Sequence, residues 1–324
     1  MMSLISMLFV KFAASLCMLF LFCGCRASAV PVVLKYKAVG PEPQMLALYE
    51  AWFGEPDHIS VGYSTKNPKT VRDQIRKAKA LGVTGFVVDW YGSRDSFVDQ
   101  SYKVIQTVAA KNKFNVAIMY DESDTDEGAT DLVIADLTMF HDTYLLKNSP
   151  GHQAYLTYQG RPVILVFPHG NHTDWAQVRA AVNQWSSPPW LLQENLPGPH
   201  PDAFDGFYPW VNPGPGGWAA DGHNWGERYL EDFYKNMADK YPDKIVMGGA
   251  WPQFDDHKAS WSLNRHISAR CGQTYRDSLD LWKKYFPAGQ VVPFMLIQTW
   301  NDYEEGSAIE PGIPTCPSGS SPSS

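Results

Sequence analysis

Short apolar runs of strand length recur along this chain, and most are separated by segments whose apolar residues lie three or four positions apart. The short runs are typical of buried strands, and the separating segments are typical of amphipathic helices. Each pair of parallel strands needs a crossover, so this alternation predicts a parallel sheet. The predicted strands cover residues 44–49, 83–88, 114–120, 163–167, 190–193, 204–208, 244–249 and 291–297.

Helices are predicted between most of these strands, over residues 68–81, 97–111, 130–146, 174–185, 224–240 and 274–285. None is expected after the fifth strand, because Pro197, Pro199 and Pro201 cannot continue a helix. None is expected after the eighth, where a tail rich in Pro, Gly and Ser follows. Eight repeats predict an α/β fold, a (β/α)8 TIM-type barrel with helices weak or missing after strands five and eight. The alternative is a doubly wound open sheet, which usually carries a Gly-rich phosphate turn after its first strand. Residues 49–54 are not such a turn.

The two ends of the chain differ in composition from the predicted barrel and set the expected limits of the domain. Residues 1–29 are predicted to be a signal peptide, with an apolar core over 12–22 and a small-x-small cleavage site at 27–29. The barrel domain then covers 30–312, and 313–324 is expected to be a flexible tail. This predicts secretion, to the outside or to a periplasm. The alternative is processing at Cys25 to a membrane-anchored lipoprotein.

The charge and the amino-acid composition of the chain indicate which kinds of molecule it could bind. The formal net charge is −7 and no Lys/Arg-rich run stands out, which argues against nucleic acid. The 12 Trp, 16 Tyr and 16 Phe indicate a large core or a carbohydrate cleft. Outside the leader only Cys271 and Cys316 remain, and in an oxidising compartment they could form a disulfide. Their distance and the lack of a suitably spaced His argue against zinc, so we expect no metal, no cofactor and a monomer.

Acidic and aromatic residues follow nearly every predicted strand. In a barrel all strand ends open on one face, where substrate binds. Each such residue also has a simpler interpretation: Asp89 could cap a turn, Asp121 could be solvated, and His169 could bond a neighbouring loop. The candidate substrate-binding residues are Tyr49, Trp52, Trp90, Tyr91, Asp121, His169, Tyr208, Trp251, Trp300, Asn301, Tyr303 and Glu310, with Asp89 as a candidate catalytic residue.

The strongest candidates are Asp302 and Glu305, which follow the eighth strand. Positions i and i+3 share a face once a chain turns helically, so both carboxylates can reach one bond. Paired carboxylates beside aromatic rings suit glycoside hydrolysis, with one group as acid and the other as base or nucleophile. Like-charge repulsion from Glu304 and Asp302 would raise the pKa of Glu305, as a general acid requires.

The segment from Trp300 to Glu310 resembles the catalytic segments of two glycoside hydrolase families. One is family 99, the endo-α-mannosidases and endo-α-mannanases, with Asn-Glu-Trp-His-Glu-Gly-Thr-x-Ile-Glu. The other is family 71, the α-1,3-glucanases, with Trp-Asn-Asp-Tyr-Gly-Glu-Ser. Residues 63–68, 85–91, 205–208 and 246–275 are also similar to family 99.

By this resemblance Asp302 falls on the first catalytic carboxylate and Glu305 on the second, the general acid. In family 99 the first takes the proton of the sugar 2-hydroxyl, with net retention; family 71 inverts. Asp302 and Tyr303 follow family 71, and Gly92-Ser93 stands where some family 99 members have Pro-Pro. The expected protein is a secreted endo-acting hydrolase of α-mannan or α-1,3-glucan. The alternatives are a non-catalytic carbohydrate-binding lipoprotein and an enzyme acting on another polymer.

Overall fold

The computed structural model describes residues 42–122, 129–170, 172–214, 224–286 and 290–315, which fall within one compact unit, 37–324. The predicted signal peptide, Cys25 and the tail from Cys316 onward lie outside the described residues. Cys271 is disulfide-bonded, while Cys316, its expected partner, lies in the undescribed part. No helix in the described ranges is both long and apolar enough to cross a membrane.

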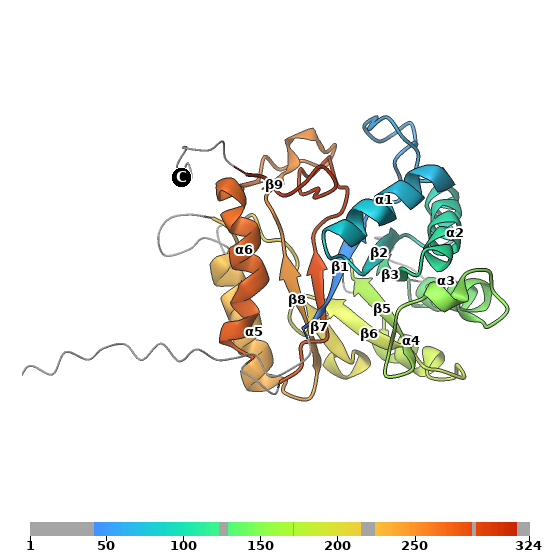
Figure 1. Ribbon diagram of the computed structural model, residues 1–324. Helices are drawn as coiled ribbons and strands as arrows, with labels where there is room; N and C mark the ends of the chain where they lie inside the picture. The colour runs from blue at the N-terminus through green and yellow to red at the C-terminus, as the bar shows by residue number, and fades with distance from the viewer. Residues whose placement is uncertain (1–41, 123–128, 171, 215–223, 287–289, 316–324) are drawn as a thin grey trace, which may run out of the picture. The chain divides into compact units, whose positions relative to one another are not determined.

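Eight parallel strands close into a barrel (Figure 1). Around the ring the order is β3-β2-β1-β11-β8-β7-β6-β5, and pairing of β3 with β5 completes the circle. The predicted (β/α)8 fold is therefore confirmed. The strands are β1 (Gln44–Tyr49), β2 (Gly85–Trp90), β3 (Asn115–Asp121), β5 (Arg161–Phe167), β6 (Trp190–Glu194), β7 (Gly206–Tyr208), β8 (Ile245–Ala250) and β11 (Phe294–Ile297).

The outer helices lie where they were predicted, and in the described part of the chain they are missing at the two places where none was expected, after the fifth and eighth barrel strands. After β6 only a 3₁₀ turn, Pro201–Ala203, stands where a barrel helix would be. After β11 the described chain, up to residue 315, contains no helix. The helices are α1 (Pro68–Ala80), α2 (Ser96–Lys111), α3 (Ala129–Phe140), α4 (Trp175–Val182), α5 (Glu227–Lys240) and α6 (Gln273–Asp280).

Two helical turns complete the predicted helices 130–146 and 274–285, whereas the elements of two or three residues were not predicted because they carry no periodic signal. A π-helical turn, His141–Leu145, extends α3, and a 3₁₀ turn, Leu281–Lys284, extends α6. Within the described residues, further 3₁₀ turns lie at His152–Ala154, Asp256–Lys258 and Arg270–Gly272. The short strands are β4 (Thr157–Tyr158), antiparallel to β5, and β9 (Phe254–Asp255), which forms a hairpin with β10 (His266–Ile267).

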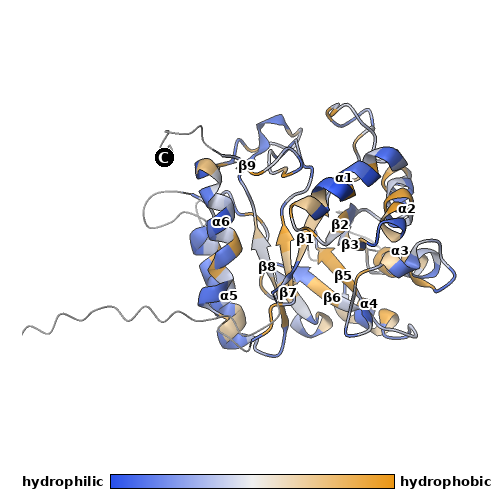
Figure 2. Ribbon diagram, in the orientation of Figure 1, coloured by the Kyte–Doolittle hydropathy of each residue, from blue (hydrophilic) through white to orange (hydrophobic). Residues whose placement is uncertain are grey.

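The apolar residues of the strands and of the inner helix faces form the core. All six residues of β2 are buried, and Figure 2 shows the polar faces of α1, α5 and α6 turned outward. The Asn67 and Asp95 side chains cap the first turns of α1 and α2. At Gly206 any side chain would fail to fit, because a Cβ would come within 2.4 Å of the Ile245 carbonyl oxygen. This tight packing fixes where the carboxyl ends of the strands lie.

Candidate active site

A cavity of about 580 Å³ lies where the barrel strands end. Its walls come from the ends of β2, β3 and β5 and from the segments after β1, β2, β5, β7, β8 and β11, as expected for the catalytic face of a barrel. The lining residues are Glu50, Trp52, His58, Asp89, Tyr91, Asp95, Met119, Asp121, Phe167, His169, Trp210, Val211, Pro213, Phe254, Trp261, Arg265, Asp302 and Glu305. The predicted residues Trp52, Asp89, Tyr91, Asp121, His169, Asp302 and Glu305 are thus brought together.

Asp302 and Glu305 share one turn after β11. The Asp302 backbone N–H donates to Thr299 Oγ1 at 2.7 Å. Asp302 Oδ1 accepts from the backbone N–H groups of Glu304 at 2.9 Å and Glu305 at 2.8 Å. These bonds fold the chain so that both carboxylates face the cavity.

Burial and neighbouring charge shift the titration of this pair. Burial, together with the nearby Glu305 carboxylate, raises the pKa of Asp302 to about 8, against the opposing effect of its backbone hydrogen bonds. Burial also raises the pKa of Glu305, opposed by a hydrogen bond from Trp261 and by the charge of Arg265. The pair therefore holds on to protons at pH values where ordinary carboxyl groups have lost them.

Glu50 and Asp89 form a second carboxyl pair in the cavity wall. Both are buried, and Glu50 Oε2 and Asp89 Oδ1 receive no donor. Tyr91 Oη donates to Asp89 Oδ2 at 2.5 Å. Burial raises the pKa of both groups, with added repulsion from Asp89 at Glu50 and from Asp121 at Asp89.

Asp121 and His169 face the cavity from β3 and the loop after β5. His169 Nε2 lies 2.7 Å from Asp121 Oδ1, and the His169 backbone N–H donates to Glu122 at 3.1 Å. Burial raises the pKa of Asp121, although His169 opposes the shift. Burial likewise raises the pKa of nearby Glu194 to about 7. Within the described residues, no group of three or more His, Cys, Asp or Glu is placed to hold a metal ion.

Aromatic rings form much of the remaining wall. Trp52 stacks on His58 with ring centroids 4.6 Å apart and planes within 8°. Trp261 meets Trp52 edge to face at 6.3 Å. With Tyr91 and Trp210, these rings give the cavity the flat apolar surfaces that bind sugar faces.

Eight predicted residues do not line the cavity. Five of them are fully buried and bond or pack within the fold, so their prediction as substrate-binding residues is wrong: Tyr49, Trp90, Tyr208, Trp251 and Trp300. Tyr49 Oη donates to Gln74 and Trp90 Nε1 to Asp99, both in the outer helices. Tyr208 and Trp251 donate to the carbonyl oxygens of Val166 and Trp225, and Trp300 packs on Phe86. Successive residues of a strand point to opposite faces, so many strand-end residues turn toward the helices instead.

The other three organise the segment after β11. Asn301 is buried and bonds the backbone of Glu50. Glu310 accepts from Tyr303 Oη at 3.1 Å, from Tyr63 Oη at 3.0 Å and from Gln74 at 3.0 Å, and it pairs with Lys77. These contacts bind the catalytic-face loop to α1.

Several residues that line the cavity were not predicted from the sequence. Glu50 directly follows β1, so the rule that picked out Asp89 would have found it. His58, Trp261 and Arg265 lie in long loops, where no periodicity indicates that they return to the cavity.

The model of glycosyl hydrolase family 71 matches residues 58–316, most of the chain. The chain belongs to glycosyl hydrolase family 71. As a family 71 protein it is a glycoside hydrolase, and its substrate is a carbohydrate. No curated protein sequence matches it.

Solved structures resemble this family 71 protein in fold. The GH99 endo-alpha-mannosidase of Bacteroides thetaiotaomicron superposes with a TM-score of 0.63 at 18% identity, covering 86% of this chain and 91% of that one. Its complex with BIS-TRIS-propane gives 0.63 at 19% identity, covering 82% and 86%. A glycoside hydrolase-like protein gives 0.61 at 14% identity, covering 87% and 90%. At these identities the likeness establishes the barrel fold alone.

Proposed function

We propose that this family 71 protein is a secreted, endo-acting α-glycosidase in which Glu305 is the general acid and Asp302 the base. The observation that carries the proposal is the turn after β11, whose backbone bonds to Asp302 direct both carboxylates into the cavity. A cavity open at a barrel face and lined with aromatic rings suits the interior of a glycan chain. Family membership favours α-1,3-glucan as substrate. The fold shared with an endo-alpha-mannosidase makes α-mannan the second candidate.

The two carboxyl groups differ in a way that suits these roles. Asp302 is more deeply buried, and two backbone donors hold its Oδ1, which stabilises the charge of a base. Glu305 accepts one hydrogen bond on Oε1, from Trp261, which leaves Oε2 to carry a proton. In the reaction Glu305 protonates the glycosidic oxygen as the bond to C1 breaks. Asp302 takes a proton either from water, giving inversion, or from the sugar 2-hydroxyl, giving retention.

A polysaccharide panel tests the activity. Wild type is incubated with α-1,3-glucan, α-mannan, α-1,6-glucan and a β-glucan control, and new reducing ends are measured. We expect release from one α-glycan and a drop in kcat of at least about 10³-fold in Asp302→Asn and Glu305→Gln, since each removes a proton-transfer group. Asp239→Asn, on the exposed face of α5, is the matched control and keeps the wild-type rate.

Two outcomes would overturn the assignment. Near-normal rates in Asp302→Asn on the true substrate would exclude this carboxylate as base. No release from any glycan, with binding retained in wild type and both variants, would favour the carbohydrate-binding protein. NMR of the first-formed anomer separates inversion from retention.

Secretion rests on the leader sequence. Mass spectrometry of the mature N-terminus tests it: cleavage after Ala29 supports a secreted enzyme, and a lipid-modified Cys25 supports an anchored one.

A further inference from the structure

The segment between β9 and β10 wraps around one buried carboxylate. Asp256 is fully buried and accepts hydrogen bonds from Ser262 Oγ at 3.0 Å, Leu263 N at 3.2 Å, Arg265 N at 2.8 Å and Arg265 Nε at 2.7 Å. Burial opposes ionisation, yet the bonds from Arg265 and its neighbours outweigh it and lower the pKa of Asp256 to about 2. A charged residue so fully bonded fixes residues 256–265, the Asp256 loop, in one conformation.

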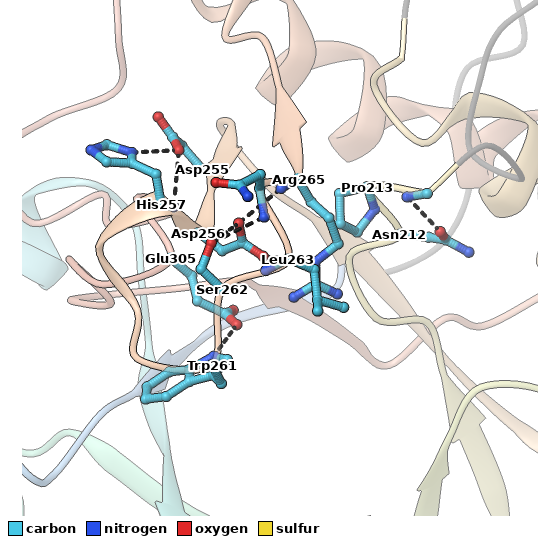
Figure 3. Close-up of polar contacts among 12 residues, drawn as sticks. Asn212, Pro213, Asp255, Asp256, His257, Trp261, Ser262, Leu263, Arg265 and Glu305 are labelled. Atoms are coloured by element: carbon cyan, nitrogen blue, oxygen red, sulfur yellow. Dashed lines mark hydrogen bonds and ion pairs between the residues drawn. The ribbon is translucent and has the colours of Figure 1, made fainter.

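The Asp256 loop and its base are fastened to the turn that carries Glu305. The Asp255 backbone N–H donates to the Glu305 carbonyl oxygen at 2.7 Å, and Gln253 Nε2 donates to the Gly306 carbonyl oxygen at 2.8 Å. At the tip of the loop, Trp261 Nε1 donates to Glu305 Oε1 at 3.0 Å (Figure 3). The side chain and the backbone of Glu305 are therefore both held by the same segment.

Trp261 is also one of the few large apolar side chains exposed at the surface. It is 43% exposed and lines the cavity, and its neighbour Leu263 is 71% exposed. An aromatic ring that stays accessible beside a cavity offers an apolar face for a sugar ring. The fixed loop gives this ring a defined position without the cost of ordering it on binding.

We propose that Trp261 forms the leaving-group subsite and is the positioning residue for Glu305. The inference rests on the proposed function, with Glu305 as acid. A general acid must contact the glycosidic oxygen, so the departing sugar lies on the side of the acid. Trp261 bonds that acid directly, and its exposed ring therefore borders the departing sugar rather than the sugar that keeps C1.

The hydrogen bond from the Trp261 indole N–H to Glu305 becomes stronger as Glu305 gives up its proton. The proton of Glu305 passes to the glycosidic oxygen, the C1–O bond breaks with its electron pair going to that oxygen, and Glu305 becomes a carboxylate. Hydrogen bonds to an ionised group are stronger than those to a neutral one. Trp261 thus stabilises the form of Glu305 that is produced in the transition state, while holding its orientation beforehand.

Two variants and two substrates separate these roles. One substrate is an oligosaccharide of the glycan identified by the panel; the other is an aryl glycoside of the glycone half, whose good leaving group needs neither acid nor leaving-group subsite. We expect Trp261→Ala to lower kcat/KM on the oligosaccharide by about 10–100-fold but on the aryl glycoside by less than about 3-fold. Trp261→Phe keeps the ring and loses the N–H, so the KM for the oligosaccharide changes by less than about 3-fold.

A pH profile reports the positioning role. The bond from Trp261 lowers the pKa of Glu305, so Trp261→Phe moves the alkaline limb of kcat/KM on the oligosaccharide to higher pH. Trp282→Phe, on the surface turn after α6, is the matched control and leaves both limbs in place. A merely structural role for Trp261 would not move this limb.

The outcomes distinguish this inference from the proposed function. If Glu305→Gln loses activity on the oligosaccharide yet keeps it on the aryl glycoside, Glu305 is the acid. With that result in hand, equal losses on both substrates in Trp261→Ala, or an unshifted limb in Trp261→Phe, would overturn the role of Trp261 alone. If Glu305→Gln affects neither substrate, the proposed function fails instead.

Discussion

The side-chain amide of Asn301 bonds the backbone of Glu50 on both sides. Asn301 Oδ1 accepts from the Glu50 N–H at 2.8 Å, and Asn301 Nδ2 donates to the Glu50 carbonyl oxygen at 2.9 Å. The bonds join the ends of the first and last barrel strands, 251 positions apart in the chain. This clamp places the Glu50–Asp89 pair beside the turn that holds Asp302.

Asn301→Ala removes both bonds of this buried clamp. We expect a loss of about 2–4 kcal/mol in the free energy of unfolding, because the Glu50 backbone groups are left buried without partners. Asn301→Asp keeps the acceptor but loses the donor, and adds a charge beside several carboxylates, so it should be at least as destabilising. Urea unfolding followed by tryptophan fluorescence measures this.

Asn67→Ala is the control for the clamp, because it removes an exposed helix cap with a single bond. We expect it to cost about 1 kcal/mol. A cost for Asn301→Ala no greater than that of Asn67→Ala would mean that the clamp contributes little to barrel closure.

The sequence was sufficient for the barrel because its signals are local. The run before Gln298 is apolar enough to be a buried strand, and Pro197 to Pro201 forbid a helix whatever the rest of the chain does. Whether each residue at a strand end points into the cavity or into the core could not be predicted in the same way. Trp300 and Asp302 are two positions apart, yet Trp300 packs in the core on Phe86 while Asp302 lines the cavity, because both follow the end of β11, where the alternation of strand faces no longer applies.

Residues from long loops were beyond prediction for a physical reason. Trp261 reaches Glu305 because hydrogen bonds to Asp256 hold the loop that carries Trp261 in one conformation. Bonds to a single buried carboxylate leave no periodic pattern in the sequence, so this contact could not be predicted. Glu50 is different: it stands next to a predicted strand, and the same rule that selected Asp89 applies to it. Glu50 could therefore have been predicted from the sequence, whereas Trp261 could not.

The pH dependence of catalysis should reflect the raised pKa of Asp302. A base must be ionised, and burial with the nearby Glu305 raises this pKa to about 8, so kcat/KM should fall as pH drops below that region. An ordinary Asp would lose activity only near pH 4. Because the two carboxyl groups interact, the limbs of the profile belong to the pair. Initial rates on the true substrate between pH 4 and 10 measure it, and full kcat/KM maintained down to pH 5 would contradict the prediction.

Glu50→Gln tests the raised pKa of Glu50 in the second carboxyl pair. The folded protein raises the pKa of Glu50 and of Asp89, so it binds their protons more tightly than the unfolded chain does. Stability from these groups is therefore present below the unfolded pKa values, near 4, and is lost as pH rises toward the folded values. Glu50→Gln replaces this buried carboxyl with an amide that does not ionise, so the pH-dependent loss that comes from Glu50 disappears. We expect Glu50→Gln to gain stability relative to wild type between pH 5 and 8, by about 1 kcal/mol or more.

Denaturant unfolding at the two pH values measures this difference. Glu42→Gln is the control, because Glu42 is an exposed carboxyl outside the cavity and should leave the pH dependence unchanged. If Glu50→Gln lost stability relative to wild type as pH rose, the pKa of Glu50 would not be raised in the folded protein.

Gly92 and Gly82 offer a matched pair for the loop that positions Tyr91. Both have positive φ, +78° and +83°, so alanine strains the backbone at either site. At Gly82 an added Cβ meets nothing within 4 Å, whereas at Gly92 it would lie 2.1 Å from Asp136 Oδ2. That carboxylate is buried, accepts from Tyr120 Oη at 3.0 Å and pairs with Arg94 at 3.3 Å.

Gly92→Ala must therefore displace Asp136 as well as strain the backbone. We expect Gly82→Ala to cost about 1 kcal/mol and Gly92→Ala about 2 kcal/mol more. Because the strained loop follows Tyr91, which bonds Asp89 in the cavity wall, Gly92→Ala should also lower kcat/KM several-fold, while Gly82→Ala leaves it unchanged. If the two variants lost the same free energy of unfolding, Asp136 and its partners could move aside without cost. The contact between Gly92 and Asp136 would then not be what positions the loop.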